Sequence, residues 1–123
     1  MKKFNYPSSN YVVVESILLA EALEVITLNQ RGAVVVVNDK GILLGILSDG
    51  DVRRALLRGA TLATPVSKLI NLNVISLSNK ESLKDRSKEI FETKTVVNII
   101  PVVDSRNKVV DIIVRNPGVR KES

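Results

Sequence analysis

The densest group of chemically capable side chains in this 123-residue chain is the run from Ser48 to Arg54. It combines a hydroxyl, two carboxylates and the guanidinium groups of Arg53 and Arg54, and the apolar spacing beyond it predicts a helix that begins here. Amide groups at a helix start could bind a phosphate, which Arg53 or Arg54 could neutralise. Asp51 could accept charge-assisted hydrogen bonds from two ligand hydroxyls, each worth ~1.5–3 kcal/mol. Ser48 and Asp51 are also ordinary helix-capping residues, and two acids at the helix start would partly cancel the attraction for phosphate.

The remaining composition excludes several kinds of catalysis. The chain contains no cysteine and no histidine, which removes disulfides, thiol nucleophiles, histidine-based triads and zinc sites with sulfur or imidazole ligands. The run 45–50 has the wrong spacing for a serine-hydrolase elbow, and Asp49-Gly50-Asp51 lacks the further alternating ligands of a calcium loop. The chain also has no Walker-type glycine-rich loop. We therefore expect a non-catalytic protein without a resident metal or cofactor.

The net charge of +5 suggests nucleic acid as a partner. The basic residues are scattered over several segments, however, and the four aromatic residues offer little surface on which bases could stack. We rank nucleic-acid binding last among the functions considered. No apolar run approaches the ~20 residues that span a bilayer, and Met1-Lys2-Lys3-Phe4 is not followed by an apolar signal core. A cytoplasmic location without membrane contact is the expectation.

Two apolar–turn–apolar segments, 34–48 and 100–114, repeat at a constant offset, so that Val37 corresponds to Val103 and Gly45 to Asp111. Each predicts a β-hairpin, with Gly41 and Asn107 supplying the positive φ of its turn. At the same offset, Ser16 and Ser82 each precede a helical pattern, over 17–28 and 83–91. Short strands are expected before these helices, at 11–14 and 74–77.

The first hairpin is followed by a second helical pattern that ends at Gly59, a natural left-handed stop. Thr64 then resembles an N-cap, with Pro65 at the first position of a short helix. The predicted fold class is α/β (α+β), with two tandem units of strand–helix–strand–strand–helix packed sheet to sheet. The first unit covers residues 1–63 and the second 64–115. Residues 116–123 carry no apolar pattern and read as a loose tail. The second unit lacks a clear final helix, because Asn116-Pro117-Gly118 stops it.

These segments resemble CBS (cystathionine-β-synthase) domains, which occur as tandem pairs known as Bateman modules. Gly45-Ile46-Leu47-Ser48-Asp49-Gly50-Asp51-Val52 is similar to the family signature G-h-h-[ST]-x-x-D-h. Ile100-Pro101-Val102-Val103-Asp104 resembles the family's h-P-V-V-D strand, and Val66–Ile70 followed by Asn73–Leu77 resembles the start of a second unit. The resemblance covers about residues 11–115. The sequence of Ser48–Leu56 most resembles that of the CBS pairs fused to sugar-phosphate nucleotidyltransferases. This resemblance implies that the chain is either a stand-alone module or a regulatory piece of such a protein.

The resemblance implies pseudo-twofold symmetry and an adenosine compound (AMP, ADP, ATP or S-adenosylmethionine) in the cleft between the units. Ser48 would contact phosphate or ribose, and Asp51 would accept hydrogen bonds from the ribose hydroxyls. Adenine would lie against aliphatic side chains of the first unit, for which the candidates are Val12, Val14, Val34 and Val35. Val114 and Pro117 occupy the positions of Ser48 and Asp51 in the second unit, so at most one full site is expected.

The predicted function is therefore a regulatory module that binds an adenine nucleotide and acts on an effector or nucleotidyltransferase domain. The alternative is an oligomerisation module with a vestigial ligand site. CBS pairs often dimerise through their helices, so a homodimer formed by the outer helices, over 17–28 and 83–91, is expected in either case.

Overall fold

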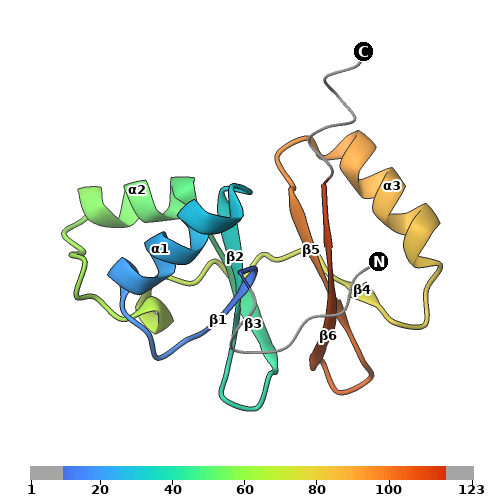
Figure 1. Cartoon of the computed structure of the whole chain (residues 1–123), viewed down its shortest axis with the longest axis horizontal. Helices are drawn as coiled ribbons and strands as arrows, with labels where there is room; N and C mark the ends of the chain where they lie inside the picture. Colours follow the sequence, from blue (N-terminus) through green and yellow to red (C-terminus); the bar gives the residue numbers. More distant parts are fainter. Residues whose placement is uncertain (1–9, 116–123) are drawn as a thin grey trace.

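The computed structural model describes residues 10–115 and contains two three-stranded sheets, each with its helices on its outer side (Figure 1). The first sheet has the order β1-β2-β3 and the second β4-β5-β6, and in each the first pair of strands is parallel and the second antiparallel. This arrangement confirms the predicted fold class. The elements of the first unit are β1 (Val12–Val14), α1 (Leu19–Asn29), β2 (Ala33–Val37), β3 (Leu43–Ser48) and α2 (Asp49–Leu57). A 3-10 turn, η1 (Val66–Lys68), precedes β4 (Leu77–Ser78), α3 (Leu83–Thr93), β5 (Ile99–Val103) and β6 (Val109–Val114).

The two hairpins keep the predicted repeat offset in every detail of their pairing. Val37 pairs with Leu43 in the first and Val103 with Val109 in the second, and each hairpin has an irregularity just before that pair. Gly41 has a φ of 83° and Asn107 a φ of 65°, as expected for left-handed turn positions.

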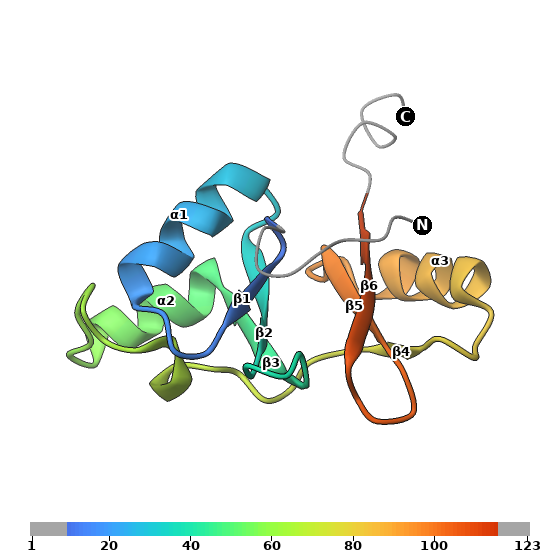
Figure 2. The ribbon, with the colours of Figure 1, turned by 60° about the horizontal axis from the view of Figure 1, so that its bottom comes forward.

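The hairpin ends also join the two units through a reciprocal pair of hydrogen bonds. Leu43 N donates to Asn107 O at 2.9 Å, and Val109 N donates to Gly41 O at 3.0 Å. The repeat maps Leu43 onto Val109 and Gly41 onto Asn107, so each bond is the equivalent of the other across the predicted pseudo-twofold axis. The two sheets face each other across this axis (Figure 2).

The alternation of side chains along β2 explains how one strand serves two cores. All five of its residues are buried. Val35 and Val37 pack with Ile99 and Val103 of the second unit between the sheets, whereas Val34 and Val36 pack in a separate cluster against the helices of the first unit. Burial on both faces accounts for the unbroken apolar run of this strand.

The prediction that Ser16 opens the first helix is wrong. α1 begins at Leu19 after Leu18, whereas α3 begins at Leu83 after Ser82 as expected. The loop from α3 to β5 is longer by two positions than the loop from α1 to β2, so the start of α3 falls short of the hairpin offset by the same amount. The residues before α1 instead pair with the segment that joins α2 to β4 (residues 58–76, here called the linker), where Val66 N donates to Ile17 O at 2.9 Å.

Two further predictions need correction around the linker. Thr64-Pro65 does not begin an α-helix, because only the single 3-10 turn η1 forms there. Pro65 is the N-cap of this turn rather than its first residue, and it has an extended ψ of 142°. The strand predicted at 74–77 is confined to Leu77–Ser78.

Pro101 supplies the reason for the short strand. In the first unit, Val35 N donates to Tyr11 O at 2.8 Å at the start of the parallel pair. Pro101 occupies the position of Val35 in the second unit and has no N–H. The register pairs Leu77 with Val102, so the acceptor that loses its donor is the carbonyl of Ile75.

Gly59 follows α2 with a φ of 108°, which confirms the predicted stop of that helix. The predicted boundary at residues 63 and 64 lies between α2 and η1 and stays a prediction. The predicted stop at Asn116-Pro117-Gly118 and the predicted tail fall at 116–123, outside the described residues. Among the helices of residues 10–115, none has the length and apolar content to cross a membrane.

Candidate functional site

A cavity of about 610 Å³ lies where the two units meet, within the size range of small-molecule sites. Four stretches that are separate in sequence form most of its wall. They are the start of β2, the junction of β3 with α2, the linker, and the loop before β5. The lining residues are Arg31, Gly32, Ala33, Ile46, Ser48, Asp49, Gly50, Asp51 and Arg54 from the first unit, Asn71, Asn73, Val74 and Ile75 from the linker, and Val96, Val97, Asn98 and Ile99 from the second unit.

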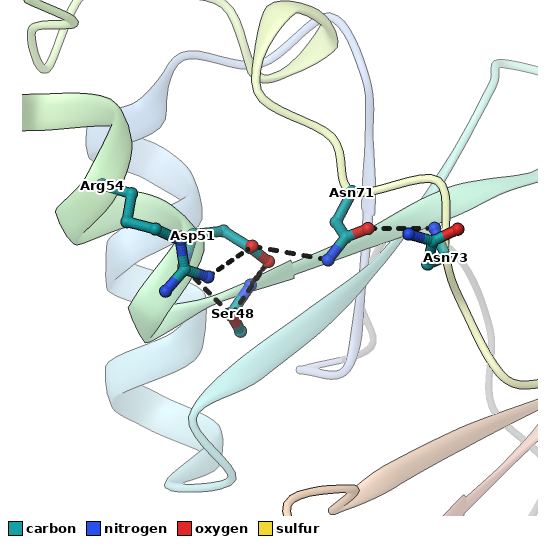
Figure 3. Close-up of polar contacts among 5 residues, drawn as sticks. All are labelled: Ser48, Asp51, Arg54, Asn71 and Asn73. Atoms are coloured by element: carbon teal, nitrogen blue, oxygen red, sulfur yellow. Dashed lines mark hydrogen bonds and ion pairs between the residues drawn. The ribbon is translucent and has the colours of Figure 1, made fainter. Parts of the chain in front are cut away.

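Ser48 and Asp51 form a reciprocal cap at the start of α2 (Figure 3). Asp51 N donates to Ser48 Oγ at 3.1 Å, while Ser48 N and Ser48 Oγ each donate to Asp51 Oδ2 at 2.9 Å. This is the capping arrangement that satisfies free amides at a helix start. Oδ2 of Asp51 therefore serves the helix cap and is not available to a ligand.

The other carboxylate oxygen of Asp51 has partners that a ligand could replace. Arg54 Nη2 donates to Asp51 Oδ1 at 3.0 Å, and Asn71 Nδ2 lies at 3.5 Å from the same atom. The Asp51 side chain is 12% exposed, whereas the Arg54 side chain is 57% exposed. An exposed ion pair of this kind contributes little to stability, about 0–1 kcal/mol. Arg54 can therefore leave Oδ1 at small cost when a better donor arrives.

Gly45 allows the linker to reach this site. Ile46 N donates to Asn71 O at 3.0 Å, and Asn71 N donates to Ile46 O at 2.9 Å, so the linker pairs with β3 at one point. A Cβ on Gly45 would lie closer than 3.0 Å to Asn71 O and to a methyl group of Ile70. The crossing brings Asn71 beside Asp51, and Asn71 Oδ1 in turn accepts from Asn73 N at 2.9 Å (Figure 3).

The backbone of Val74 and Ile75 forms a polar edge on the cavity wall. Within residues 10–115, no hydrogen bond joins the backbone N–H or C=O of either residue to another group. Both residues are half-buried and line the cavity. Unpaired backbone groups cost free energy unless a ligand or water satisfies them. The absence of an N–H at Pro101 leaves this edge open.

Arg31 adds a positively charged wall. Its Nε is buried and has no hydrogen-bond partner within the described part of the chain. The Arg31 backbone is held from both sides, because its N–H donates to Asn29 Oδ1 at 2.7 Å and its carbonyl accepts from Asn98 Nδ2 at 3.1 Å. A buried donor without a partner costs about 1–3 kcal/mol, so an anionic ligand group at Arg31 would gain a preformed contact.

The structure brings together only some of the residues predicted from sequence. Ser48, Asp51 and Arg54 line the cavity, whereas Arg53 is exposed on α2 and does not line it. The four predicted aliphatic contacts do not line it either. Val12 and Val35 are buried in the core between the sheets, and Val14 is partly buried and packs against that core. Val34 is buried against the helices of the first unit.

Sequence reasoning missed the contributions of Arg31, Asn71, Asn98 and the Val74–Ile75 backbone. The proline in the second hairpin was the available signal for the open edge, because it marks a strand position without a donor. Nothing local marked Arg31 or Asn98, whose roles depend on contact between the units. In residues 10–115, no cluster of three or more His, Cys, Asp or Glu side chains could hold a metal ion.

Comparison with known proteins agrees with the fold. The sequence profile described as "CBS domain" matches residues 4–58. The fold is similar to that of CBSX2 from Arabidopsis thaliana, solved in complex with AMP, with a TM-score of 0.67 and 25% identity over 94% of this chain and 90% of that one. Residues 4–58 are thus a CBS domain, and the fold of the chain is that of CBS-pair proteins. CBS pairs are regulatory modules that are typically non-catalytic.

Two curated relatives of this CBS pair are much longer than the chain itself. An uncharacterized protein of Helicobacter pylori strain J99 is 34% identical over 102 residues, which is 83% of this chain and 31% of the relative. The arabinose 5-phosphate isomerase GutQ of Salmonella typhi is 33% identical over 82 residues, which is 67% of this chain and 25% of the isomerase. The chain thus spans about a third or less of these relatives.

Proposed function

We propose that this CBS pair is a regulatory module that binds an adenine nucleotide in the cavity between its two units. The observation that carries the proposal is the open backbone edge at Val74 and Ile75, which shares one cavity with the Ser48–Asp51 cap. A half-buried edge of unpaired N–H and C=O groups suits a flat heterocycle that presents both donors and acceptors. The Watson–Crick edge of adenine does so, with N1 as acceptor and the N6 amino group as donor.

Ribose and phosphate follow from the rest of the wall. Asp51 Oδ1 would accept hydrogen bonds from the ribose hydroxyls in place of those from Arg54 and Asn71. Arg54, once released, and Arg31 would then neutralise the phosphate. The second unit has Val114 where the first has Ser48, so we propose one such site per chain.

The comparisons support this assignment and suggest what is regulated. CBSX2, at 25% identity, has been solved with AMP, and a curated relative is a sugar-phosphate isomerase. We propose that the module regulates a sugar-phosphate enzyme in the cytoplasm, either an isomerase or a nucleotidyltransferase.

A thermal-shift panel tests the ligand, with AMP, ADP, ATP, S-adenosylmethionine, adenosine and GMP, each with and without magnesium. A ligand at ~100 times its dissociation constant adds ~2.7 kcal/mol to the free energy of unfolding, which raises the melting temperature of a chain of this size by about 10 °C. The proposal predicts such a rise with an adenine nucleotide. If no adenosine compound shifts the melting curve at millimolar concentration, the chain is not an adenine-nucleotide module.

Asp51→Ala should remove most of the nucleotide-dependent rise in melting temperature and should weaken nucleotide binding in calorimetric titration. The matched control is Asp85→Ala. Asp85 also accepts from the serine that precedes its helix, with Ser82 Oγ at 3.0 Å from Asp85 Oδ2, but it does not line the cavity. Both variants remove a carboxylate that accepts from the hydroxyl of the serine before its helix, so a difference in nucleotide affinity reports on the site.

A second candidate function is oligomerisation, and exposed leucines favour it. Leu28 on α1 is 68% exposed, and Leu57 at the end of α2 is 82% exposed. Homodimerisation through the helices would cover them. Light scattering of the chain over a range of concentrations tests this, and a monomer at all concentrations would exclude it.

A further inference from the structure

Arg115 directly follows β6, and its side chain folds back on the loop between α3 and β5. Its Nη2 donates to Lys94 O at 3.2 Å and to Val97 O at 2.8 Å, and its Nε donates to Val97 O at 3.1 Å. The guanidinium carbon lies 4.7 Å from the centroid of the Phe91 ring, a cation–π distance. One side chain therefore ties the end of α3 to the loop that follows it.

Asn98, at the end of that loop, lies between Arg115 and the first unit. Its Oδ1 accepts from Arg115 Nε at 3.1 Å, and its backbone carbonyl accepts from Arg115 N at 2.8 Å. Its Nδ2 donates across the unit boundary to Arg31 O at 3.1 Å. Asn98 and Arg31 both line the cavity. A continuous set of hydrogen bonds thus runs from the cavity wall to the residue at which the chain leaves β6.

The first unit shows that the fold itself does not require this arginine. Its equivalent backbone bond runs from Asp49 N to Gly32 O at 2.9 Å, and the repeat maps these two positions onto Arg115 and Asn98. Gly32 has no side chain, and Asp49 carries the opposite charge. The Arg115–Asn98 pair is therefore a device of the second unit, added to a backbone pattern that both units share.

The geometry assigns to Arg115 the role of a positioning residue for the nucleotide site. It holds residues 96–98 as the second-unit wall of the cavity and couples occupancy of the cavity to the chain that leaves β6. The assignment rests on the proposed function, since the ligand is the nucleotide. Because coupling is reciprocal, a ligand that binds in the cavity should stabilise the Arg115 end of β6, and a contact that stabilises this end should raise the affinity of the cavity for its ligand.

The test uses the full 123-residue chain and AMP as the probe. Arg115→Met should weaken AMP binding at least fivefold in calorimetric titration, the lower end of typical coupling. The control Arg86→Met removes an arginine of α3 that pairs only with Glu81 and Glu89 in the described part of the chain, and it should bind AMP as the wild type does. Arg115→Lys keeps the charge but cannot reach Lys94, Val97 and Asn98 together, so it should give an intermediate loss if Arg115→Met does not fold.

Hydrogen exchange distinguishes positioning from general stability. In the wild type, AMP should slow exchange of the Arg115 amide at least fivefold. In Asn98→Ala, which cuts the side-chain path but keeps the backbone bond, this protection should disappear.

This inference would be overturned if Arg115→Met and Arg115→Lys both bound AMP as tightly as the wild type and if AMP did not change the exchange rate of the wild-type Arg115 amide. That result would leave the proposed function intact. A wild type that binds no adenine nucleotide would overturn the proposed function, and the inference with it.

Discussion

Gly45→Ala is the substitution with the largest expected effect for its size. It adds one methyl group on β3 directly beneath the linker. That methyl group would lie closer than 3.0 Å to Asn71 O and to a methyl group of Ile70, and 3.1 Å from the Asn71 carbonyl carbon. Backbone atoms cannot swing aside as a side chain can, so the linker itself must move away from β3.

The magnitude follows from what this movement breaks. Inserting a methyl group into a packed contact costs about 1–3 kcal/mol. The two hydrogen bonds between Ile46 and Asn71, at 2.9 and 3.0 Å, contribute about 0.5–1.5 kcal/mol each. Together these terms predict a loss of about 2–6 kcal/mol in the free energy of unfolding, against a total of about 5–15 kcal/mol for an ordinary domain.

Urea denaturation measures the loss, with Gly50→Ala as the matched control. The Cβ at position 50 would meet only the far end of the Arg54 side chain, at 3.2 Å, which can move. Alanine also favours the helix by about 0.5–1 kcal/mol over glycine. The same chemical change should therefore destabilise at position 45 and be neutral or stabilising at position 50. If the free energy of unfolding of Gly45→Ala lies within about 0.5 kcal/mol of the wild-type value, the ordinary range for a harmless surface substitution, the close crossing is not a determinant of the fold.

The remaining predictions concern other parts of the structure. Pro101→Val restores the missing N–H, so β4 should extend toward Val74 and stability should rise by about 0.5–1.5 kcal/mol, while AMP affinity falls; titration that shows unchanged affinity would contradict the role of the open edge. Asn29→Ala removes a buried side chain that donates to Asn10 O at 2.7 Å and Ala33 O at 3.0 Å, and should cost about 2–3 kcal/mol in urea denaturation. Backbone hydrogen bonds from Lys108 N and Arg106 N lower the pKa of Asp104 from 3.8, so its stabilising effect is present above that ordinary value and is lost as the pH falls through the lowered pKa. Asp104→Asn should flatten this acid dependence, and Asn38→Asp should create it in the first turn, where Asn38 Oδ1 accepts from Lys40 N and Ile42 N in the same way; acid titrations of melting temperature that do not differ would contradict both expectations.

The predicted helix boundaries show where sequence reasoning reached its limit. The hairpins were placed correctly because their signals, alternation of apolar residues and a turn residue with positive φ, lie within the segments themselves. The helix start predicted at Ser16 depends on extending the hairpin offset upstream. That extension failed because the loop before each hairpin differs in length by two positions, and loops tolerate such differences with little effect on the sheet.

The candidate site shows the same division. Ser48 and Asp51 were recognisable because a cap and a helix start leave a local pattern. Arg54 was one of two neighbouring arginines that sequence could not separate, and only the face of α2 that meets the cavity decided between it and Arg53. The aliphatic contacts predicted at Val12, Val34 and Val35 were assigned to a ligand, whereas the structure uses these side chains in the cores.

The amino-acid sequence alone determined the two related hairpins and their turns, because each depends on residues close together in the chain. The tertiary structure alone decided which groups surround the cavity. Arg31, Asn71, Val74 and Asn98 come together only when the linker crosses Gly45 and the sheets pack face to face. Even the meaning of Pro101 depends on this packing, since a missing N–H matters only once it is known which carbonyl it would have met.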